Sequence, residues 1–284
     1  MDKFINIVIP MAGSGSRFTD VGYQDPKPLI DLFGKPMIEN VINNLIPKNN
    51  FKFIFICQEV DFKSYNLRGI FNRIIGSNWD YVTTSSLSDG PASTVMLAKD
   101  LLEDSSELIV ANSDQIIDAD ITEFINDARK DSSDGYIMTF PANEDRWSYA
   151  KIDDYGNVKE VAEKKIISTH ATVGIYYFKS SKLFKFGYHK MVSKNLRVNG
   201  EFYVAPIYNE LCLDNKMVKI WEIEKSKMHG IGTPQDLEIF CKKNEQYYNK
   251  YPVLHQYLFL LISGINILLI SFSNALIDAP DDPS

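Results

Sequence analysis

Apolar runs of strand length alternate along this chain with segments of helical spacing, and this alternation constrains the fold most. Ile5–Pro10, Phe51–Cys57 and Glu107–Ala111 are each long enough for one buried strand, whereas Pro36–Leu45 places its apolar residues on one helical face. Parallel strands need a long connection between them, which is usually a helix. The pattern therefore predicts an α/β fold with a mainly parallel mixed sheet flanked by helices. Further helices are expected at 92–102, 121–130, 205–213 and 234–248, and further strands at 135–140 and 218–223.

Between Tyr149 and Phe178 the alternation gives way to a pattern typical of hairpins. Asp154–Asn157 is a strong turn signal between two segments of strand character, and Ala171–Phe178 reads as another strand. We therefore expect β-hairpins inserted into the α/β domain.

Charge and cysteine content exclude several classes of protein. The 284 residues include 30 Lys and Arg against 37 Asp and Glu, a formal net charge of −7. Such an acidic chain is unsuited to nucleic acid, whose phosphates are neutralised by Lys and Arg. The 3 cysteines form no C-x-x-C pair, which argues against a disulfide framework and a zinc ribbon and favours a reducing, cytoplasmic compartment. An anion site must therefore be built locally.

The C-terminal segment differs from the rest of the chain. Residues 253–277 contain no Asp, Glu, Lys or Arg, and about 20 such residues are enough to span a bilayer. Polar residues such as Asn266 and Ser271 dilute the segment, however. We expect a catalytic domain at 1–250 and an apolar tail at 251–284. The tail either anchors the protein to a membrane, by spanning it or by contact with its inner face, or docks on the domain or a partner subunit, or is not native to the fold.

A glycine-rich loop, Met11–Phe18, follows the first strand directly. Its glycines let the backbone approach a phosphate, and successive backbone N–H groups form an anion-binding nest. Arg17 adds a planar fork of donors, and Lys27 adds a compact charge. Phe18 stands where the dinucleotide-binding pattern needs a third glycine, and the Gly-Lys-Ser/Thr of a P-loop is missing.

The loop and the motifs after it resemble the nucleotidyltransferase family over residues 4 to 240. This family includes sugar-1-phosphate nucleotidylyltransferases and phosphocholine-type cytidylyltransferases of bacterial surface-polysaccharide pathways. The resemblance implies a Rossmann-like nucleotidyltransferase fold whose inserted hairpins bind the acceptor. The matching segments are Gly13–Arg17, Pro26–Pro28, Gly34–Ile38, Ser88–Ala92, Asn112–Asp114, Glu163–Lys164, Val173–Tyr176 and Gly232–Leu237.

The resemblance implies that an acceptor phosphate attacks the α-phosphorus of a nucleoside triphosphate and releases pyrophosphate. The acceptor phosphate is largely ionised near neutral pH, so the reaction needs positioning and charge neutralisation rather than a general base. Arg17 would hold the departing pyrophosphate, and Lys27 the α-phosphate. The implied nucleotide-binding residues are Met11, Ala12, Gly13, Ser14, Gly15, Ser16, Gly90 and Pro91.

The same resemblance assigns a metal and an acceptor site. Asp114 would hold Mg²⁺, which often takes only one or two carboxylates together with substrate phosphates. Lys164 would face the acceptor phosphate, and Glu163 would accept from a hydroxyl or ammonium group. The implied acceptor-binding residues are Glu163, Lys164, Gly174 and Glu201. The implied partners are thus a nucleoside triphosphate and a phosphorylated small molecule. The amino-acid sequence of Met11–Phe18 favours CTP as the triphosphate.

One position departs from the family pattern. Where the family often has a second metal-binding aspartate, this chain has Gly230. His229 or Glu201 would be a replacement, and a metal held by Asp114 and phosphates alone is equally open.

Two other functions remain open. Asp118 and Asp120 have the D-x-D form of glycosyltransferases that consume nucleotide sugars, although Asp120 also suits a helix N-cap. A non-catalytic nucleotide-binding protein is the other alternative. Trp147 and Tyr149 are candidates to line an acceptor pocket and to contact a cationic head group.

Overall fold

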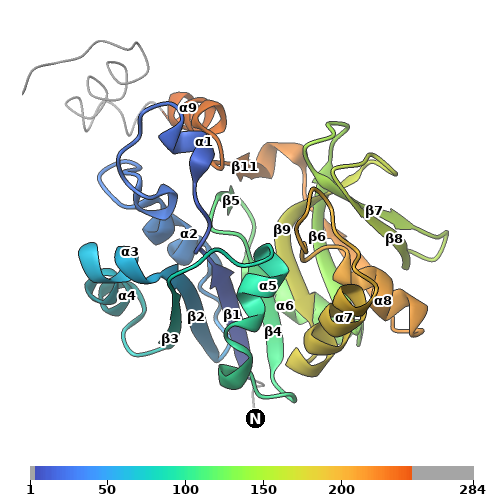
Figure 1. Ribbon diagram of the computed structural model, residues 1–284. Helices are drawn as coiled ribbons and strands as arrows, with labels where there is room; N and C mark the ends of the chain where they lie inside the picture. The colour runs from blue at the N-terminus through green and yellow to red at the C-terminus, as the bar shows by residue number, and fades with distance from the viewer. Residues whose placement is uncertain (1–3, 245–284) are drawn as a thin grey trace, which may run out of the picture.

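A mixed sheet of nine strands forms the centre of residues 4–244, the part of the chain that this computed structural model describes. A separate pair of short strands lies beside it (Figure 1). The large sheet contains β1 (Ile5–Pro10), β2 (Phe51–Gln58), β3 (Trp79–Thr84), β4 (Glu107–Ala111), β6 (Gly135–Pro141), β7 (Ser148–Ile152), β8 (Val158–Glu163), β9 (His170–Phe178) and β10 (Val218–Glu222). The short pair is β5 (Gln115–Ile117) and β11 (Met228–Gly230).

The strand order across the sheet is β10-β6-β9-β4-β1-β2-β3. β1 pairs in parallel with β2 and β4, β2 pairs in parallel with β3, and β10 pairs in parallel with β6. β9 is antiparallel to both β4 and β6. This arrangement confirms the predicted mainly parallel mixed sheet. In register, Ile5 of β1 faces Phe51 and Glu107, so the carboxyl ends of β1 and β4 reach the same edge.

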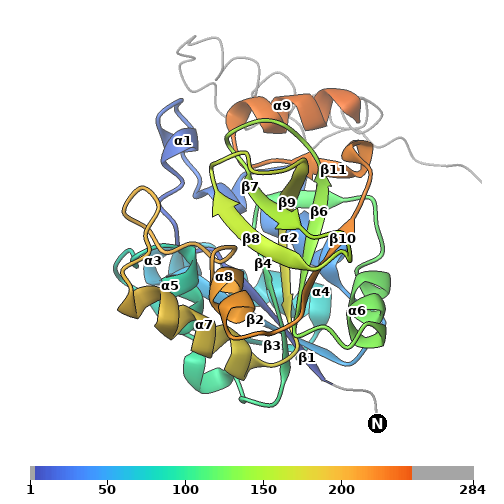
Figure 2. The same ribbon diagram turned by 90° about the vertical axis from the view of Figure 1, so that its right-hand side faces the viewer.

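Helices cover both faces of the sheet, which Figure 2 shows edge-on. They are α1 (Ser16–Thr19), α2 (Met37–Leu45), α3 (Glu59–Ser64), α4 (Leu67–Ile75), α5 (Pro91–Met96), α6 (Ile121–Lys130), α7 (Ser181–Ser193), α8 (Ile207–Leu213) and α9 (Pro234–Lys243). One apolar core joins α2, α4 and α6 to one face of the sheet, and a second core joins α5, α7 and α8 to the other. Each buried strand contributes side chains to both cores, because successive side chains point to opposite faces of the sheet. Ile7 belongs to the first core and Val8 to the second.

The predicted hairpin forms at β7 and β8. Gly156 lies in its turn with φ +79°, a left-handed conformation that glycine adopts without strain. β7 also touches the main sheet, where Tyr149 pairs with Ala171 of β9. The hairpin is thereby anchored at one corner of the sheet (Figure 1).

The chain returns to the carboxyl edge of the sheet through β11. Gly230 pairs with Gln115 of β5, and the Ile231 N–H donates to the Asp114 carbonyl at 2.9 Å. Thr233 then caps α9 by accepting from the Asp236 N–H. This closing element, residues 228–237, therefore lies beside the end of β4.

Several elements were not predicted from the sequence. Strand β3 is an edge strand whose residues are all half-buried, and α3 has no buried residue, so neither shows a strong apolar period. Helix α7 was missed because Gly187 interrupts its pattern; Gly187 instead lets α7 approach Ile207 of α8 closely. The expected tail at 251–284 lies outside the described residues. Within 4–244, no helix is long and apolar enough to cross a membrane.

A buried ion pair ties the sheet to α6. The Glu107 carboxylate on β4 is 2 % exposed and accepts from two nitrogens of Arg129, at 3.0 and 2.6 Å. The Tyr177 hydroxyl on β9 also donates to Glu107, at 2.8 Å. Removing the carboxylate would leave the guanidinium largely buried without its counter-charge.

We expect Glu107→Ala to lower the free energy of unfolding by about 3 kcal/mol or more, because breaking a buried pair strands its partner. Urea unfolding followed by circular dichroism measures this. Glu59→Ala is the control, since Glu59 pairs with Lys63 on the surface of α3 and its loss should leave the urea midpoint unchanged. Equal midpoints for the two variants would contradict the assignment.

Candidate functional site

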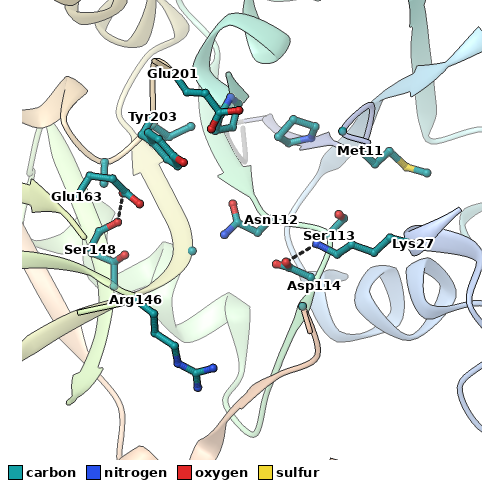
Figure 3. A pocket seen from close by; sticks show the side chains of 18 of the residues that line it. Met11, Lys27, Asn112, Ser113, Asp114, Arg146, Ser148, Glu163, Glu201 and Tyr203 are labelled. Carbon is teal, nitrogen blue, oxygen red and sulfur yellow. Dashed lines mark hydrogen bonds and ion pairs between the residues drawn. The ribbon is translucent and has the colours of Figure 1, made fainter. Parts of the chain in front are cut away.

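A pocket of about 440 Å³ opens at the carboxyl edge of the sheet. Its walls come from the loops after β1 and β4, the β7–β8 hairpin, β9, the 201–205 segment and Gly232 of the closing element. Figure 3 shows Lys27 and Asp114 on one side of this pocket and Glu163, Glu201 and Tyr203 on the other. The pocket thus joins two groups of charged side chains that are far apart in sequence.

The glycine-rich loop, which the sequence predicts to bind the nucleotide, lines one side of the pocket. Residues lining the pocket there are Met11, Gly13, Ser14, Gly15, Ser16 and Arg17. The loop is held by β2, because Met11 N donates to the Ile56 carbonyl and the Gln58 amide donates to the Ala12 carbonyl. Ala12 itself is buried and is not part of the lining. Gly15 has φ +64°, and a Cβ there would lie 3.1 Å from that of Lys27.

Two cations reach this side of the pocket. Arg17 has no ion-pair partner among residues 4–244, so its guanidinium is available to an anion. The Lys27 ammonium is 2.5 Å from the Asp114 carboxylate, and each side chain is about one-fifth to one-quarter exposed. Lys27 begins a short 3₁₀ turn, 27–29, whose Pro28 and Leu29 are buried and fix its position.

Asp114 is confined by the closing element. A Cβ on Gly232 would lie 3.0 Å from the Asp114 Cγ and closer still to its carboxylate oxygen. Only glycine therefore leaves this carboxylate in contact with Lys27. No three His, Cys, Asp or Glu side chains within 4–244 converge on a metal site. Asp114 supplies a hard oxygen ligand that suits Mg²⁺, and phosphate oxygens would have to supply most of the others.

The loop at Gly90 and Pro91 is fastened to the segment that carries Glu201. Phe202 N donates to the Asp89 carbonyl at 2.7 Å, and Ala92 N donates to the Phe202 carbonyl at 3.0 Å. Gly90 has φ +112°, and a Cβ there would lie 2.7 Å from the Phe202 nitrogen. Pro91 lines the pocket, whereas Gly90 packs against Phe202 behind it. We call this contact the 89–202 clasp.

Glu163, which the sequence predicts to bind the acceptor, lies with its surroundings on the opposite side of the pocket. The Ser148 hydroxyl donates to the Glu163 carboxylate (Figure 3). Burial raises the pKa of Glu163, and the nearby Glu201 carboxylate raises it further, while Ser148 and Lys164 oppose the shift. Tyr176 lies in the same wall, and burial raises the pKa of its hydroxyl. Gly174, with φ +95°, leaves room for the Asn112 amide, which lines the floor.

Lys164 and Glu201 meet at Tyr203, a residue that the sequence did not single out. The Lys164 ammonium donates to the Tyr203 hydroxyl at 2.8 Å and lies 4.9 Å from the ring centre. Burial raises the pKa of Tyr203, and a hydrogen bond and charge from Glu201 raise it further, so the phenol stays protonated. All three residues line the pocket.

Arg146 is a second lining residue that the sequence did not reveal. Its guanidinium bonds both carboxylate oxygens of Asp236 at 2.8 and 3.0 Å and lies 4.3 Å over the Trp147 ring. Trp147 lines the pocket as predicted, but the cation that lies over its ring is the guanidinium of Arg146 and not the head group of a ligand. A Cβ on Gly230 would point at Trp147 and Asp236, at 3.6 and 3.9 Å.

The remaining candidates lie elsewhere. The Nε2 atom of His229 lies 2.7 Å from a carboxylate oxygen of Asp118, and His229 does not line the pocket, so the structure does not bring it to Asp114. Asp120 caps α6 through the Thr122 N–H and pairs with Lys48, as expected of an N-cap. Tyr149 is fully buried and donates to the Glu144 carbonyl, which makes it a core residue. The D-x-D pair is therefore separate from the pocket.

An α/β sheet with a glycine-rich loop and a facing carboxylate at its carboxyl edge is typical of proteins that bind phosphate groups of nucleotides. The sequence profile of the nucleotidyl transferase family matches residues 7–203. The chain therefore belongs to the nucleotidyl transferase family, and the predicted class of enzyme, a nucleotidyltransferase, is confirmed.

Several relatives resemble this chain. The bifunctional protein GlmU of Methanococcus aeolicus is 26 % identical over 243 residues, 82 % of this chain and 53 % of the relative, so the chain spans about half the length of that protein. The 2-aminoethylphosphonate cytidylyltransferase of Lancefieldella rimae is 27 % identical over 61 % of this chain and 66 % of the relative.

Solved structures share the fold. The nucleoside-diphosphate-sugar pyrophosphorylase from Vibrio cholerae superposes with a TM-score of 0.74 at 27 % identity, covering 83 % of this chain and 99 % of that one. The inositol-1-phosphate CTP transferase from T. maritima superposes with a TM-score of 0.66 at 13 % identity, covering 92 % and 98 %. The second likeness concerns the fold alone.

We expect Gly232→Ala to push the Asp114 carboxylate away from Lys27 and to lower turnover by about 10²-fold, since a misplacement of about 1 Å has that effect. Thermal unfolding should change little, because the displaced group is the end of a side chain. Gly230→Ala is the matched control: it adds the same methyl group two residues earlier in ordinary contact distance. Pyrophosphate release measures both, and equal activity of the two variants would contradict this role of Gly232.

Proposed function

We propose that this enzyme transfers a nucleoside monophosphate from a nucleoside triphosphate to a phosphorylated small metabolite and releases pyrophosphate. The contact between Lys27 and Asp114, beside a glycine loop whose Arg17 has no ion-pair partner within 4–244, carries this proposal. We place the reaction in the cytoplasm, where free triphosphates and reduced thiols are found, and in the synthesis of a bacterial surface polysaccharide. The catalytic domain would occupy residues 1–250.

In this reaction an oxygen of the acceptor phosphate attacks the α-phosphorus. The new bond is phosphorus to acceptor oxygen, and the broken bond joins the α-phosphorus to the bridging oxygen of the departing pyrophosphate. The attacking phosphate is already ionised, so no proton has to move. Lys27 would neutralise the α-phosphate, and Arg17 would hold the β- and γ-phosphates, with the loop N–H groups supplying further donors.

The opposite wall suits a phosphorylated acceptor. Lys164 would face its phosphate, while the Glu163 and Glu201 carboxylates would accept from hydroxyl or ammonium groups. A sugar 1-phosphate and a phosphocholine-like ester both carry such groups. The similarity to a cytidylyltransferase and the amino-acid sequence of the Met11–Phe18 loop support CTP as the triphosphate.

Mg²⁺ would be held by Asp114 together with the phosphates, and it would supply neutralisation of phosphate charge when bound. The Asp114 carboxylate forms an ion pair with the Lys27 ammonium. Gly230 brings no second carboxylate, and His229 is turned to Asp118. Within the described residues no three His, Cys, Asp or Glu side chains converge at this edge, so the phosphates would supply most of the metal ligands.

The proposal is tested by pyrophosphate release with each of the four triphosphates and a panel of phosphorylated acceptors. We expect release with CTP and one acceptor class, and a loss of about 10²–10³-fold in turnover for Lys27→Ala, as for other removed charge stabilisers. Lys48→Ala is the control, because Lys48 is 83 % exposed and pairs with Asp120 away from the pocket. No pyrophosphate with any pair, with hydrolysis of a nucleotide sugar, would favour the glycosyltransferase reading. Binding of triphosphate without any turnover would favour a non-catalytic role.

We further expect that Mn²⁺, used as a spectroscopic substitute for Mg²⁺, binds only when a triphosphate is present. One carboxylate already paired with a lysine is a weak metal site, whereas triphosphate oxygens complete it. Electron paramagnetic resonance of free Mn²⁺, titrated with the chain in the presence and absence of CTP, measures this. Asp114→Asn should weaken Mn²⁺ binding in the ternary mixture. Tight binding without nucleotide would show a metal site that Asp114 alone does not explain.

A further inference from the structure

Tyr203 is the point at which the two charged acceptor residues meet. Its hydroxyl accepts from the Lys164 ammonium at 2.8 Å, and the Glu201 carboxylate lies beside the same hydroxyl. A neutral phenol is both donor and acceptor, so it can bridge an ammonium and a carboxylate at once. A phenylalanine at position 203 would lack the hydroxyl, and a direct ion pair would bring Lys164 and Glu201 into contact. Neither would keep the two charged groups as they are placed here.

The backbone of Lys164 shows that its position is imposed by the surroundings. Lys164 has φ +54°, which is unusual for a residue with a long side chain, and its N–H donates to the Trp147 carbonyl at 3.1 Å. Such a conformation is strained and persists only where the surrounding contacts determine it. The side chain that leaves this backbone ends on Tyr203 (2.8 Å) rather than on any carboxylate within 4–244.

Tyr203 itself is placed by a rigid segment. Asn199 and Gly200, both with positive φ, form a tight turn that pairs Val198 with Glu201. Phe202 is then held on both sides by the 89–202 clasp and is 2 % exposed. The side chain next in sequence, Tyr203, therefore points into the pocket from a fixed backbone, on the same side as Glu201 and Glu163 (Figure 3).

We propose that Tyr203 is a positioning residue of the acceptor site: its hydroxyl fixes the Lys164 ammonium, and through it the place where the acceptor phosphate binds. Glu201 lines the same wall of the pocket, where it would meet the remainder of the acceptor. This inference rests on the proposed function in that it takes Lys164 as the partner of the acceptor phosphate. It assigns no proton transfer to Tyr203.

The test is a double-mutant cycle of Tyr203→Phe and Lys164→Met. Tyr203→Phe keeps the ring beneath Lys164 and removes only the hydroxyl, so the acceptor KM should rise about tenfold, the value of one hydrogen bond to a charged group. The KM for the triphosphate should be unchanged. Because Tyr203 acts through Lys164, the double variant should be no worse than Lys164→Met alone.

A matched control separates this role from a merely structural one. Tyr81→Phe also removes a hydroxyl that accepts from a cation, here Arg68 at 3.1 Å, but on β3 at the far edge of the sheet. It should leave both KM values unchanged. Additive effects of the two substitutions in the cycle, or a triphosphate KM that rises as much as the acceptor KM, would overturn the proposal.

A binding measurement decides the matter even if the proposed reaction is wrong. Inorganic phosphate is titrated into the wild-type chain, Tyr203→Phe and Lys164→Met by calorimetry. We expect both substitutions to weaken phosphate binding about tenfold. Equal phosphate affinity in the wild type and Tyr203→Phe would overturn the role of Tyr203, whatever the turnover assay gives. Absence of pyrophosphate release in the wild type, by contrast, would refute the proposed function alone.

Discussion

The ion pair between Lys27 and Asp114 is the interaction on which the pocket depends. The two residues are 87 positions apart in sequence, and each is brought to the contact by a different part of the fold. Lys27 follows the loop after β1, and Asp114 follows β4, the strand that pairs with β1. Gly232 leaves the carboxylate just enough room to reach the lysine. In the proposed reaction, the α-phosphate would take over Lys27 from Asp114, and the Asp114 carboxylate would then be available for a cation.

The two walls of the pocket are built on different physical grounds. On the side of the glycine-rich loop, backbone N–H groups and Arg17, which has no ion-pair partner within 4–244, form a surface that favours anions. On the opposite side, Glu163, Glu201 and Tyr203 combine acids with a neutral hydroxyl, and burial holds the pKa of Glu163 above its ordinary value. A ligand with negative charge at one end and hydroxyl or ammonium groups at the other is complementary to both walls together.

Local motifs were readable from the sequence, whereas contacts across the fold were not. The glycine loop and Asp114 each directly follow an apolar strand, so their place at the carboxyl edge follows from the strand pattern alone. Tyr203 and Arg146 gave no such signal, because their partners Lys164 and Asp236 are 39 and 90 positions away. Strand β3 was missed for a related reason: an edge strand is half-buried on both sides and shows neither alternation nor a continuous apolar run.

The 89–202 clasp has a consequence for how such an enzyme changes its specificity. The loop expected to face the base and the segment that carries Glu201 and Tyr203 share two backbone hydrogen bonds, and Gly90 leaves no space between them. A substitution that reshapes one loop therefore moves the other. With the proposed roles of these two segments, choice of nucleotide and choice of acceptor would not be independent traits, and a descendant that acquires a new base is expected to carry compensating changes at 201–203.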